Sequence, residues 1–321
     1  MRVFVTGGSG FVGRNLIRAL VSAGHAVRAL ARSEASAAVV RGLGAEVVPG
    51  DLLDEGALTV GLTGADAVVH AAADTSQGAG SATQLALNVD GTRLVFSLAR
   101  RLGVRRGVHV SSEAVLADGG PLVEVDERRP FPQRFAGGYS RSKALAETAA
   151  LEGGGDGFDV VVLRPRLVWG RDDTTFTASL VAAARAGQLV WIDGGRSLTS
   201  TTHIDNLVHA ILLCLERGPG GQVYFVADEG AVPFRQFATA VLESQGVTPP
   251  TREVPRWAAR GLATVSGCVE RLSGGRRTGP LPLQTFSLIA HEVTVNDARA
   301  RRELGYHPVI TRDEGLAALG C

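Results

Sequence analysis

Residues 2–13 read RVFVTGGSGFVG, and this stretch decides the fold. Residues 2–6 are rich in β-branched and aromatic side chains, which favours a short buried strand. Three glycines follow at a spacing of three, and a helical pattern then continues to Ala23. Glycines let a backbone approach a pyrophosphate, and the N-terminus of the next helix supplies free N–H groups. The stretch therefore predicts a dinucleotide-binding turn; the alternative is a glycine-rich turn that binds nothing.

The rest of the chain repeats this alternation of strand and helix. Further strands are expected at residues 26–31, 45–49, 66–73, 107–112 and 159–163. Strands that alternate with helices at this interval indicate βαβ units and a parallel sheet. The fold class predicted is α/β: a Rossmann-type doubly wound parallel sheet with a smaller, mostly C-terminal substrate-binding lobe.

The expected domain limits follow a change of pattern after residue 168. Residues 1–168 are expected to form the dinucleotide-binding domain, with residues 200–230 returning to it. Residues 169–199 and 231–321 would form mainly the substrate-binding lobe. The role of residues 256–290 stays open between a lid, packed core and a segment that contacts a membrane. Within them, residues 273–282 are rich in Gly, Arg and Pro and are expected to form a mobile loop.

Composition excludes several classes of protein. The chain has 321 residues, a formal net charge of +1 and 45% hydrophobic residues, which gives no reason to expect a nucleic-acid partner. Its three cysteines and seven histidines lack the spacing of a disulfide framework or a metal site. No targeting segment or apolar run of membrane-spanning length is evident. We expect a cytoplasmic protein without a metal.

Lys143 stands out because it is the only lysine among 33 Lys and Arg residues. A lysine kept in so arginine-rich a chain is expected where a compact ammonium is needed and a planar guanidinium fails. Tyr139 lies four residues earlier, on the same face of a helix. Because a nearby ammonium favours phenolate, we expect the pKa of Tyr139 to be lowered and the pair to perform acid–base chemistry.

The end of the second predicted strand bears on the choice of dinucleotide. Sites that prefer NAD place Asp or Glu there to bind the ribose 2′-hydroxyl. Here the residues are Ala31, Arg32 and Ser33. An arginine at this point can pair with a 2′-phosphate, so we infer NADPH/NADP+ in preference to NADH. The alternative is that Arg32 is a solvated surface charge.

An ordered set of motifs runs through the whole chain. Its members are Thr6-Gly7-x-x-Gly10-x-x-Gly13, Gly50-Asp51-Leu52, His70-Ala71-Ala72, Asn88-x-x-Gly91-Thr92, Ser111-Ser112, Tyr139-x-x-x-Lys143, Leu163-Arg164-Pro165, His203-x-Asp205-Asn206 and Leu304-Gly305-Tyr306-x-Pro308. Together they resemble the extended short-chain dehydrogenase/reductase family, and most of all its 3β-hydroxysteroid dehydrogenase and dihydroflavonol reductase-like branch. The resemblance implies an NAD(P)H-dependent reductase or dehydrogenase for a bulky, largely apolar ketone or secondary alcohol of steroid, polyketide or 3-oxoacyl type.

The resemblance also implies roles for single residues. Tyr139 would give a proton to the carbonyl oxygen, Lys143 would lower its pKa and hold the nicotinamide ribose, and Ser112 would hydrogen-bond the carbonyl oxygen. Ser111 is expected on the other face, because successive side chains of a strand alternate. The expected cofactor contacts are Gly7, Ser9, Gly10, Phe11, Val12, Gly13, Arg32, Ser33, Asp51, Leu52, Ala71, Ala72, Ala73, Asn88, Tyr139, Lys143, Pro165, Leu167 and Val168.

The candidate substrate contacts are Glu113, Phe135, Trp169 and Phe176. The aromatic members favour an apolar substrate, although core packing would explain them too. Glu113 could line the pocket or cap its loop. It is followed by Ala114, so the Asp-Glu pair of the family's sugar-nucleotide dehydratases is incomplete. Two alternative functions remain: a sugar-nucleotide epimerase or reductase, and a catalytically silent NADP-binding sensor.

Three smaller expectations concern loops and assembly. Asp51 could contact the adenine or cap a helix, and residues 171–173 could form a substrate loop or a solvated turn. Asp205 and Asn206 are expected to cap the helix that they open. The resemblance implies a homodimer that uses the long helix expected at 82–102 and the helix carrying Tyr139.

Overall fold

The computed structural model describes residues 1–75, 82–272, 281 and 283–320, and its largest sheet has seven strands. In spatial order these are β3 (Glu46–Pro49), β2 (Ala26–Ala31), β1 (Arg2–Thr6), β4 (Ala67–His70), β5 (Arg106–Val110), β7 (Asp159–Pro165) and β12 (Gln222–Val226). Every neighbouring pair is parallel. The predicted doubly wound parallel sheet is confirmed.

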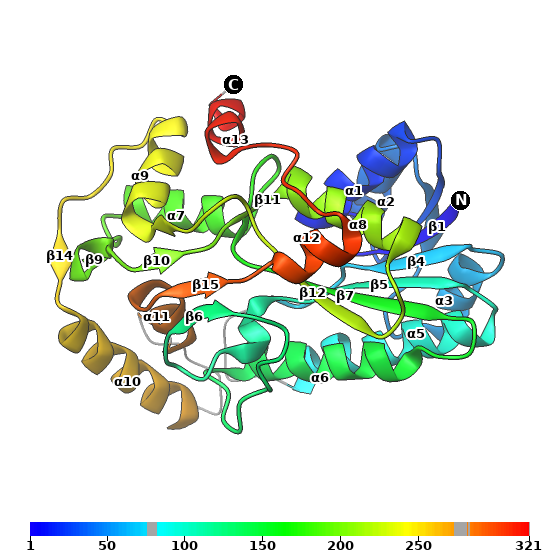
Figure 1. Ribbon diagram of the computed structural model, residues 1–321, viewed down its shortest axis with the longest axis horizontal. Helices are drawn as coiled ribbons and strands as arrows, with labels where there is room; N and C mark the ends of the chain where they lie inside the picture. Colours follow the sequence, from blue (N-terminus) through cyan, green and yellow to red (C-terminus); the bar gives the residue numbers. More distant parts are fainter. Residues whose placement is uncertain (76–81, 273–280, 282, 321) are drawn as a thin grey trace.

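Helices cover both faces of this sheet (Figure 1). One face carries α1 (Phe11–Ser22), α2 (Glu34–Gly42), α8 (Ile204–Arg217) and α12 (Ala298–Leu304), and the other carries α3 (Glu55–Leu62), α5 (Gly91–Arg101) and α6 (Gly138–Gly153). The alternation of side chains explains both layers, since Val3 and Val5 join the first buried cluster whereas Phe4 joins the second. Both faces are thus apolar, as parallel strands require.

A smaller mixed sheet lies at the other end of the molecule. Its strands, in spatial order, are β13 (Val232–Pro233), β10 (Leu198–Thr199), β15 (Val293–Val295) and β6 (Leu122–Val125). Two short strand pairs accompany it: β8 (Val168–Trp169) with β11 (Thr202–His203), and β9 (Trp191–Ile192) with β14 (Glu253–Val254). Because β6 precedes the Tyr139 helix in sequence, this sheet takes a strand from residues expected in the first domain.

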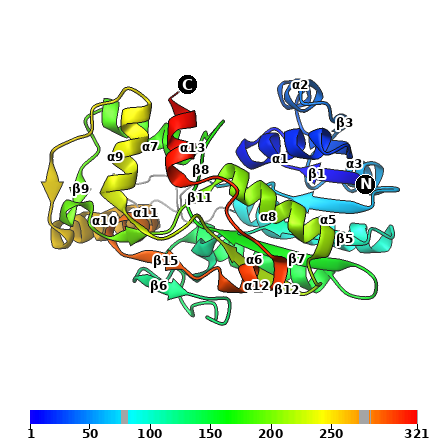
Figure 2. The ribbon, with the colours of Figure 1, turned by 45° about the horizontal axis from the view of Figure 1, so that its top comes forward.

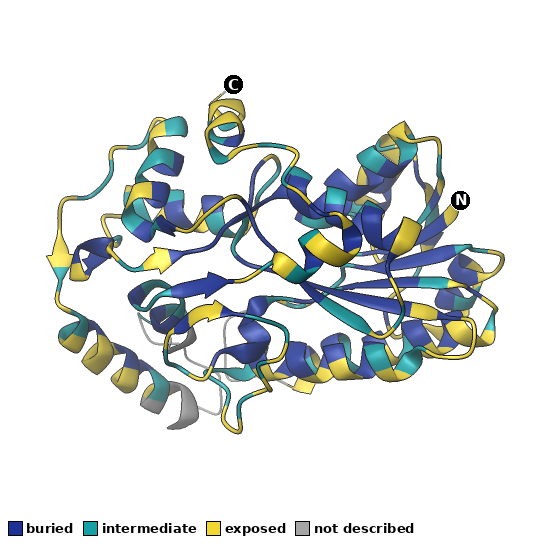
Figure 3. Ribbon diagram, in the orientation of Figure 1, coloured by how far each residue is buried: buried dark blue, intermediate teal, exposed yellow. Residues whose placement is uncertain are grey.

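The helices of this smaller lobe are α7 (Phe176–Arg185), α9 (Phe234–Ser244), α10 (Arg256–Leu272), α11 (Leu283–Ala290) and α13 (Arg312–Leu319). Figure 2 shows α7, α9 and α13 grouped away from the α1 end of the large sheet. The helix α10 lies on the periphery, with exposed positions along its outer side (Figure 3). No helix of the described part is long and apolar enough to cross a membrane. Most of the expected mobile loop at 273–282 falls outside the described residues.

The long helix expected at 82–102 is interrupted. It consists of α4 (Ala82–Leu85), a π-helical turn η1 (Ala86–Asp90) and α5. A π turn inserts an extra residue into the helix and is frequent at functional sites. Here the turn contains Asn88, which is 1% exposed and bonds Ser142 on α6, the helix that carries Tyr139 and Lys143.

Candidate active site

The glycine turn after β1 is held by close backbone packing. Gly7 has φ +75°, and a Cβ there would lie 2.6 Å from the nitrogen of Ala72. A Cβ on Gly13 would lie only 2.1 Å from the carbonyl oxygen of Gly7. Both positions therefore require glycine, and the turn brings the start of α1 against the end of β4.

The N-terminus of α1 has the features of a phosphate site. Its N-cap residue is Gly10, no described side chain caps the helix, and no acidic residue lies in its first turn. The first N–H groups of the helix are thus left for a ligand, and the helix dipole favours an anion there. These features fit the pyrophosphate of a dinucleotide.

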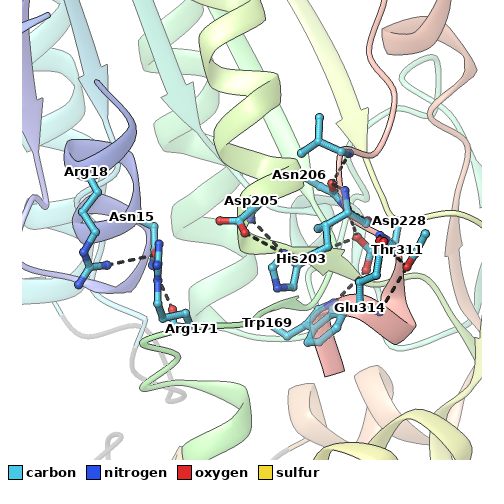
Figure 4. Close-up of polar contacts among 12 residues, drawn as sticks. Asn15, Arg18, Trp169, Arg171, His203, Asp205, Asn206, Asp228, Thr311 and Glu314 are labelled. Atoms are coloured by element: carbon cyan, nitrogen blue, oxygen red, sulfur yellow. Dashed lines mark hydrogen bonds and ion pairs between the residues drawn. The ribbon is translucent and has the colours of Figure 1, made fainter. Parts of the chain in front are cut away.

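The connection after β8 is clamped to α1. Asn15 on α1 donates to the carbonyl oxygen of Arg171 at 3.0 Å, and the Arg171 guanidinium donates back to Oδ1 of Asn15 (Figure 4). Arg18 adds an ion pair to Asp172 at 2.5 Å. Asp173 accepts hydrogen bonds from the first N–H groups of α7. Residues 171–173 thus join the two lobes. The sequence had suggested either a substrate loop or a solvated turn, and neither includes this role.

Arg32 and Ser33 lie directly after β2, at the carboxyl edge of the sheet. Arg32 is exposed, and no interaction with another described residue engages it. Ser33 is the N-cap of α2, where its hydroxyl accepts from the N–H of Ser36 at 3.2 Å. The guanidinium of Arg32 is therefore available to a ligand at this edge.

Residues 51 and 52 have local structural roles. Asp51 is exposed and accepts a hydrogen bond from the N–H of Leu53 at 3.1 Å, whereas the N-cap of α3 is Asp54. The cap alternative for Asp51 is therefore wrong. Leu52 is buried and packs against Gly91 at the start of α5.

Ser111 and Ser112 follow β5 and diverge as the alternation predicts. The Ser111 hydroxyl donates to Oε2 of Glu147 at 2.7 Å, beneath α6. The Ser112 hydroxyl instead donates to Oε2 of Glu113 at 2.6 Å, and it acts to lower the pKa of the Tyr139 phenol. The structure therefore brings Ser112, and not Ser111, to Tyr139.

Lys143 lies one helical turn after Tyr139 on α6. Its side chain is 3% exposed, and its ammonium donates to the carbonyl oxygen of Val110 at 2.8 Å. Burial lowers the pKa of Lys143 to about 8, although the nearby Glu147 carboxylate acts in the opposite direction. The ammonium is thus fixed at the end of β5, beside the serine and the tyrosine.

The pKa of Tyr139 differs from the sequence expectation. Burial, and next the Glu113 carboxylate, raise the pKa of the phenol above its ordinary value, while the Ser112 hydrogen bond opposes them. The expected lowering is therefore wrong for this structure. The physical reason is first the burial of the phenol and next the charge of the Glu113 carboxylate, while the Lys143 ammonium donates to the carbonyl oxygen of Val110.

Asn88 connects the π turn η1 to the start of α6, the helix that carries Tyr139 and Lys143. Its carboxamide accepts from the N–H of Asp74 at 2.7 Å and donates to Asp74 O and to Ser142 Oγ, each at 3.0 Å. Ser142 in turn donates to the carbonyl oxygen of Tyr139 at 2.8 Å. The Asn88 side chain, expected to contact the cofactor, is thereby engaged in holding the start of α6.

Glu113, expected to line the pocket or cap its loop, forms a buried ion pair. Its Oε1 lies 2.8 Å from Nη1 of Arg166, and both side chains are 4% exposed. Its Oε2 accepts from the Ser112 hydroxyl at 2.6 Å. Arg166 continues through Nη2 to the carbonyl oxygen of Leu288 on α11 at 2.9 Å. Glu113 therefore links the catalytic-serine candidate to the smaller lobe.

Two of the aromatic substrate candidates pack in the core of the smaller lobe. Trp169 is fully buried and donates through Nε1 to Asp228 at 2.9 Å. Phe176 is half-buried and stacks on Phe237 with ring centroids 5.7 Å apart. Core packing thus replaces the substrate contact expected for Trp169. Phe135 is half-buried against the cluster that contains Ala144 of α6.

Asp228 is an organising residue that the sequence reasoning missed. Its carboxylate is buried and accepts from four donors: Trp169 Nε1 at 2.9 Å, and Thr201 Oγ1, His203 N and Asn206 Nδ2, each at 2.7 Å (Figure 4). The N-cap of α8 is His203, not Asp205 or Asn206 as expected. Asn206 instead accepts from the N–H groups of residues 309 and 310, which ties the C-terminal segment to α8.

Comparison with known proteins agrees with this geometry. Residues 4–256 match the model of the 3-beta hydroxysteroid dehydrogenase/isomerase family. The chain is 47% identical over 319 residues to the 4-hydroxy-2-methyl-3-oxo-4-farnesyl-3,4-dihydroquinoline-1-oxide ketoreductase of Stigmatella aurantiaca, with 99% of this chain and 96% of the relative covered. It is 32% identical over 331 residues to the 2-alkyl-3-oxoalkanoate reductase of Stenotrophomonas maltophilia, covering 99% and 98%.

A solved structure shows the same architecture. The dTDP-glucose 4,6-dehydratase DesIV of Streptomyces venezuelae, with NAD and TYD bound, aligns at a TM-score of 0.76 and 25% identity, over 100% of this chain and 96% of that one. The fold and the glycine turn together define a member of the extended short-chain dehydrogenase/reductase class, and the matched family and relatives make it an oxidoreductase. Within that class the chain belongs to the 3-beta hydroxysteroid dehydrogenase/isomerase family.

Proposed function

We propose that this protein is an NADPH-dependent ketoreductase for a bulky, largely apolar ketone, with Tyr139, Ser112 and Lys143 as its catalytic residues. The observation that carries the proposal is the meeting of these three residues at the end of β5, in a fold whose α1 has no cap from a described side chain. Relatives named as reductases of 3-oxo compounds support the class of substrate. The reverse reaction would oxidise a secondary alcohol.

The chain's own groups supply the proton and hold the oxygen. A bound NAD(P)H supplies the hydride to the carbonyl carbon, and negative charge then develops on the carbonyl oxygen. Tyr139 transfers its phenol proton to that oxygen, and Ser112 is a second neutral donor beside it. Since the Ser112 proton is directed at Glu113 in this structure, the hydroxyl has to turn when a ketone enters. Lys143 holds the ribose hydroxyls and stabilises the phenolate left on Tyr139.

Tyr139→Phe tests the catalytic assignment. The substitution keeps the ring but removes the proton donor, so we expect kcat/KM for ketone reduction to fall by about 10²–10⁴-fold. NADPH binding, followed by its fluorescence, should weaken far less than kcat/KM falls, because the α1 turn is untouched. Assays should pair a panel of steroid and 3-oxoacyl ketones with UDP- and dTDP-sugars. Full activity of the variant, or turnover of a sugar nucleotide by the wild type, would overturn the proposal.

Arg32→Ala tests the preference for NADPH. The guanidinium of Arg32, which no other described residue engages, would pair with the 2′-phosphate, and its loss should weaken NADPH binding on the order of tenfold while NADH binding is unaffected. Arg41→Ala is a matched control, because Arg41 is also exposed nearby but pairs with Glu34 on α2. Equal NADPH affinity in the Arg32 variant and the control would remove Arg32 from the cofactor site.

We also propose a homodimer formed through α5 and α6. Resemblance to the extended short-chain class supports this surface. On α6, Leu145 is 40% exposed, whereas its neighbours Ala144 and Ala146 are buried. An exposed leucine on the outer face of the catalytic helix is compatible with a partner helix there.

A further inference from the structure

We propose that Glu147 is a positioning residue, whose buried contacts with β5 and β7 fix α6 along the sheet and thereby set the places of Tyr139 and Lys143. The inference deepens the proposed function and rests on it for the roles of those two residues. Glu147 follows Tyr139 by eight residues, which is about 12 Å along the helix axis. It would therefore act through the helix and not on the ketone itself.

The spacing of three side chains on α6 carries the first step. Tyr139, Lys143 and Glu147 follow one another at intervals of four residues, so they share one face of the helix. Lys143 donates to the carbonyl oxygen of Val110 at 2.8 Å, and one turn later Glu147 Oε2 accepts from the hydroxyl of Ser111 at 2.7 Å. The end of β5 is thus attached to α6 at two successive helical turns.

The ion pair between Glu147 and Arg164 of β7 carries the second step. Arg164 donates through Nη2 to Oε1 of Glu147 at 2.5 Å and through Nε to Oε2 at 3.0 Å, and both side chains are buried. Such a two-pronged pair fixes direction as well as distance. The guanidinium carbon also lies 5.5 Å from the ring centroids of Phe131 and Phe225. Glu147 is therefore held from two neighbouring strands, β5 and β7.

The two attachments of α6 differ in stiffness. The ammonium of Lys143 ends a flexible stem, and in the proposed reaction it also has to hold the ribose hydroxyls. Glu147 has no task in that reaction, and both of its carboxylate oxygens are bound to residues of the sheet. A shift of α6 by one residue would move Tyr139 by about 1.5 Å, and a misplacement of about 1 Å can cost on the order of a hundredfold in rate. Glu147 is thus the contact that sets the position of the helix.

The test replaces the ion pair by apolar side chains of similar volume, Glu147→Met with Arg164→Met. A buried ion pair replaced in this way generally leaves a folded protein, whereas removing one partner leaves a buried charge. We expect the double variant to unfold cooperatively and to bind NADPH, while kcat for ketone reduction falls about 10–100-fold and KM changes less. Glu152→Met, at an exposed position of the same helix, is the control and should keep the wild-type kcat. A folded double variant with the wild-type kcat would overturn the inference.

Ser111→Ala provides a milder variant, because it keeps the ion pair and removes one attachment to β5. Its kcat should fall about two- to tenfold, the equivalent of one hydrogen bond, with little change in thermal midpoint. A purely structural role for Glu147 predicts the opposite pattern, a lower thermal midpoint with an unchanged kcat. That pattern in Ser111→Ala would count against the inference.

A substrate-free measurement separates this inference from the proposed activity. Lys143 is the only lysine, so labelling lysine with ¹⁵N at Nζ gives one side-chain ammonium signal. The exchange of its protons with water should be at least about tenfold faster in the double variant than in the wild type, because its contact with Val110 is no longer fixed. Equal exchange in both proteins would refute the positioning role. A wild type that reduces no ketone, but whose Lys143 exchange responds to the substitutions, would contradict the proposed function and support the positioning.

Discussion

Lys143 is buried although, among the described residues, its ammonium has only the carbonyl oxygen of Val110 as a hydrogen-bond acceptor. Its pKa falls from 10.5 to about 8 in the fold, which corresponds to a cost on the order of 3 kcal/mol for holding the charged form. Below pH 8 this cost is fully present. Between pH 8 and 10.5 the unfolded chain binds more protons than the folded one, so this residue makes stability rise with pH across that window.

Lys143→Met should therefore stabilise the fold near neutral pH while abolishing activity. The lost hydrogen bond to Val110 offsets about 1 kcal/mol, which leaves a net gain of roughly 1–2 kcal/mol in the free energy of unfolding. Urea unfolding near pH 7 and near pH 10 would measure the difference. The gain should shrink at the higher pH. Arg141→Met, at an exposed site on the same helix, is the control; a pH-independent gain at Lys143 would contradict this account.

For single residues, the sequence predicted the position of a side chain only where local backbone geometry decides it. Alternation along a strand was enough to separate Ser111 from Ser112, because both follow β5 directly. The direction of the Tyr139 pKa shift was not predictable, since it depends first on the burial of the phenol and next on the Glu113 carboxylate, which is paired with Arg166 from 53 positions away. Charge pairs of this kind are set by tertiary structure, not by spacing.

At the scale of elements, the Asp228 carboxylate joins β8, β11 and α8. Asp228→Ala leaves four donors, three of them on fully buried groups, without their acceptor, and we expect a loss of about 2–4 kcal/mol in the free energy of unfolding. Thermal or urea denaturation would measure it. Glu229→Ala is the adjacent control: its carboxylate pairs with Arg301 at the surface and should contribute about 0–1 kcal/mol. Equal effects at both positions would refute the organising role of Asp228.

Elements of ordinary length were predictable, and the shortest were not. The strands of the large sheet carry apolar runs, and α1, α5 and α8 carry a clear 3.6-residue period. The strands β8, β9, β10 and β11 have two residues each, too few for any period to be recognised. The π turn also escaped prediction; within it, Asn88 bonds Asp74 and Ser142, which are 14 and 54 positions away in sequence.

At the scale of the whole molecule, the proposed dimer makes a direct prediction. Leu145→Glu places a charge on the outer face of α6 and should convert the dimer to a monomer in light scattering coupled to size exclusion. Val309→Glu is the control, since Val309 is 51% exposed on the C-terminal segment and outside the proposed surface. A wild-type monomer, or a dimer that survives the Leu145 substitution, would exclude this interface.

General rules of connection restrict the strand order of the large sheet, whereas they do not restrict the strand pairing of the smaller sheet in the same way. Right-handed βαβ crossovers leave few ways to arrange parallel strands once their sequence is known. The smaller sheet instead joins strands from residues 122–125, 198–199, 232–233 and 293–295, whose partners are distant in sequence. Such pairings depend on how the two lobes meet.

The edge strand β12 has a consequence for biosynthesis. It pairs with β7 from Gln222 to Val226, but residues 166–221 are translated between the two strands. A nascent chain therefore displays the unpaired edge of β7 while the smaller lobe is still being made. The interval in which this chain is most exposed to aggregation, or to capture by a chaperone, ends only when residues 222–226 leave the ribosome.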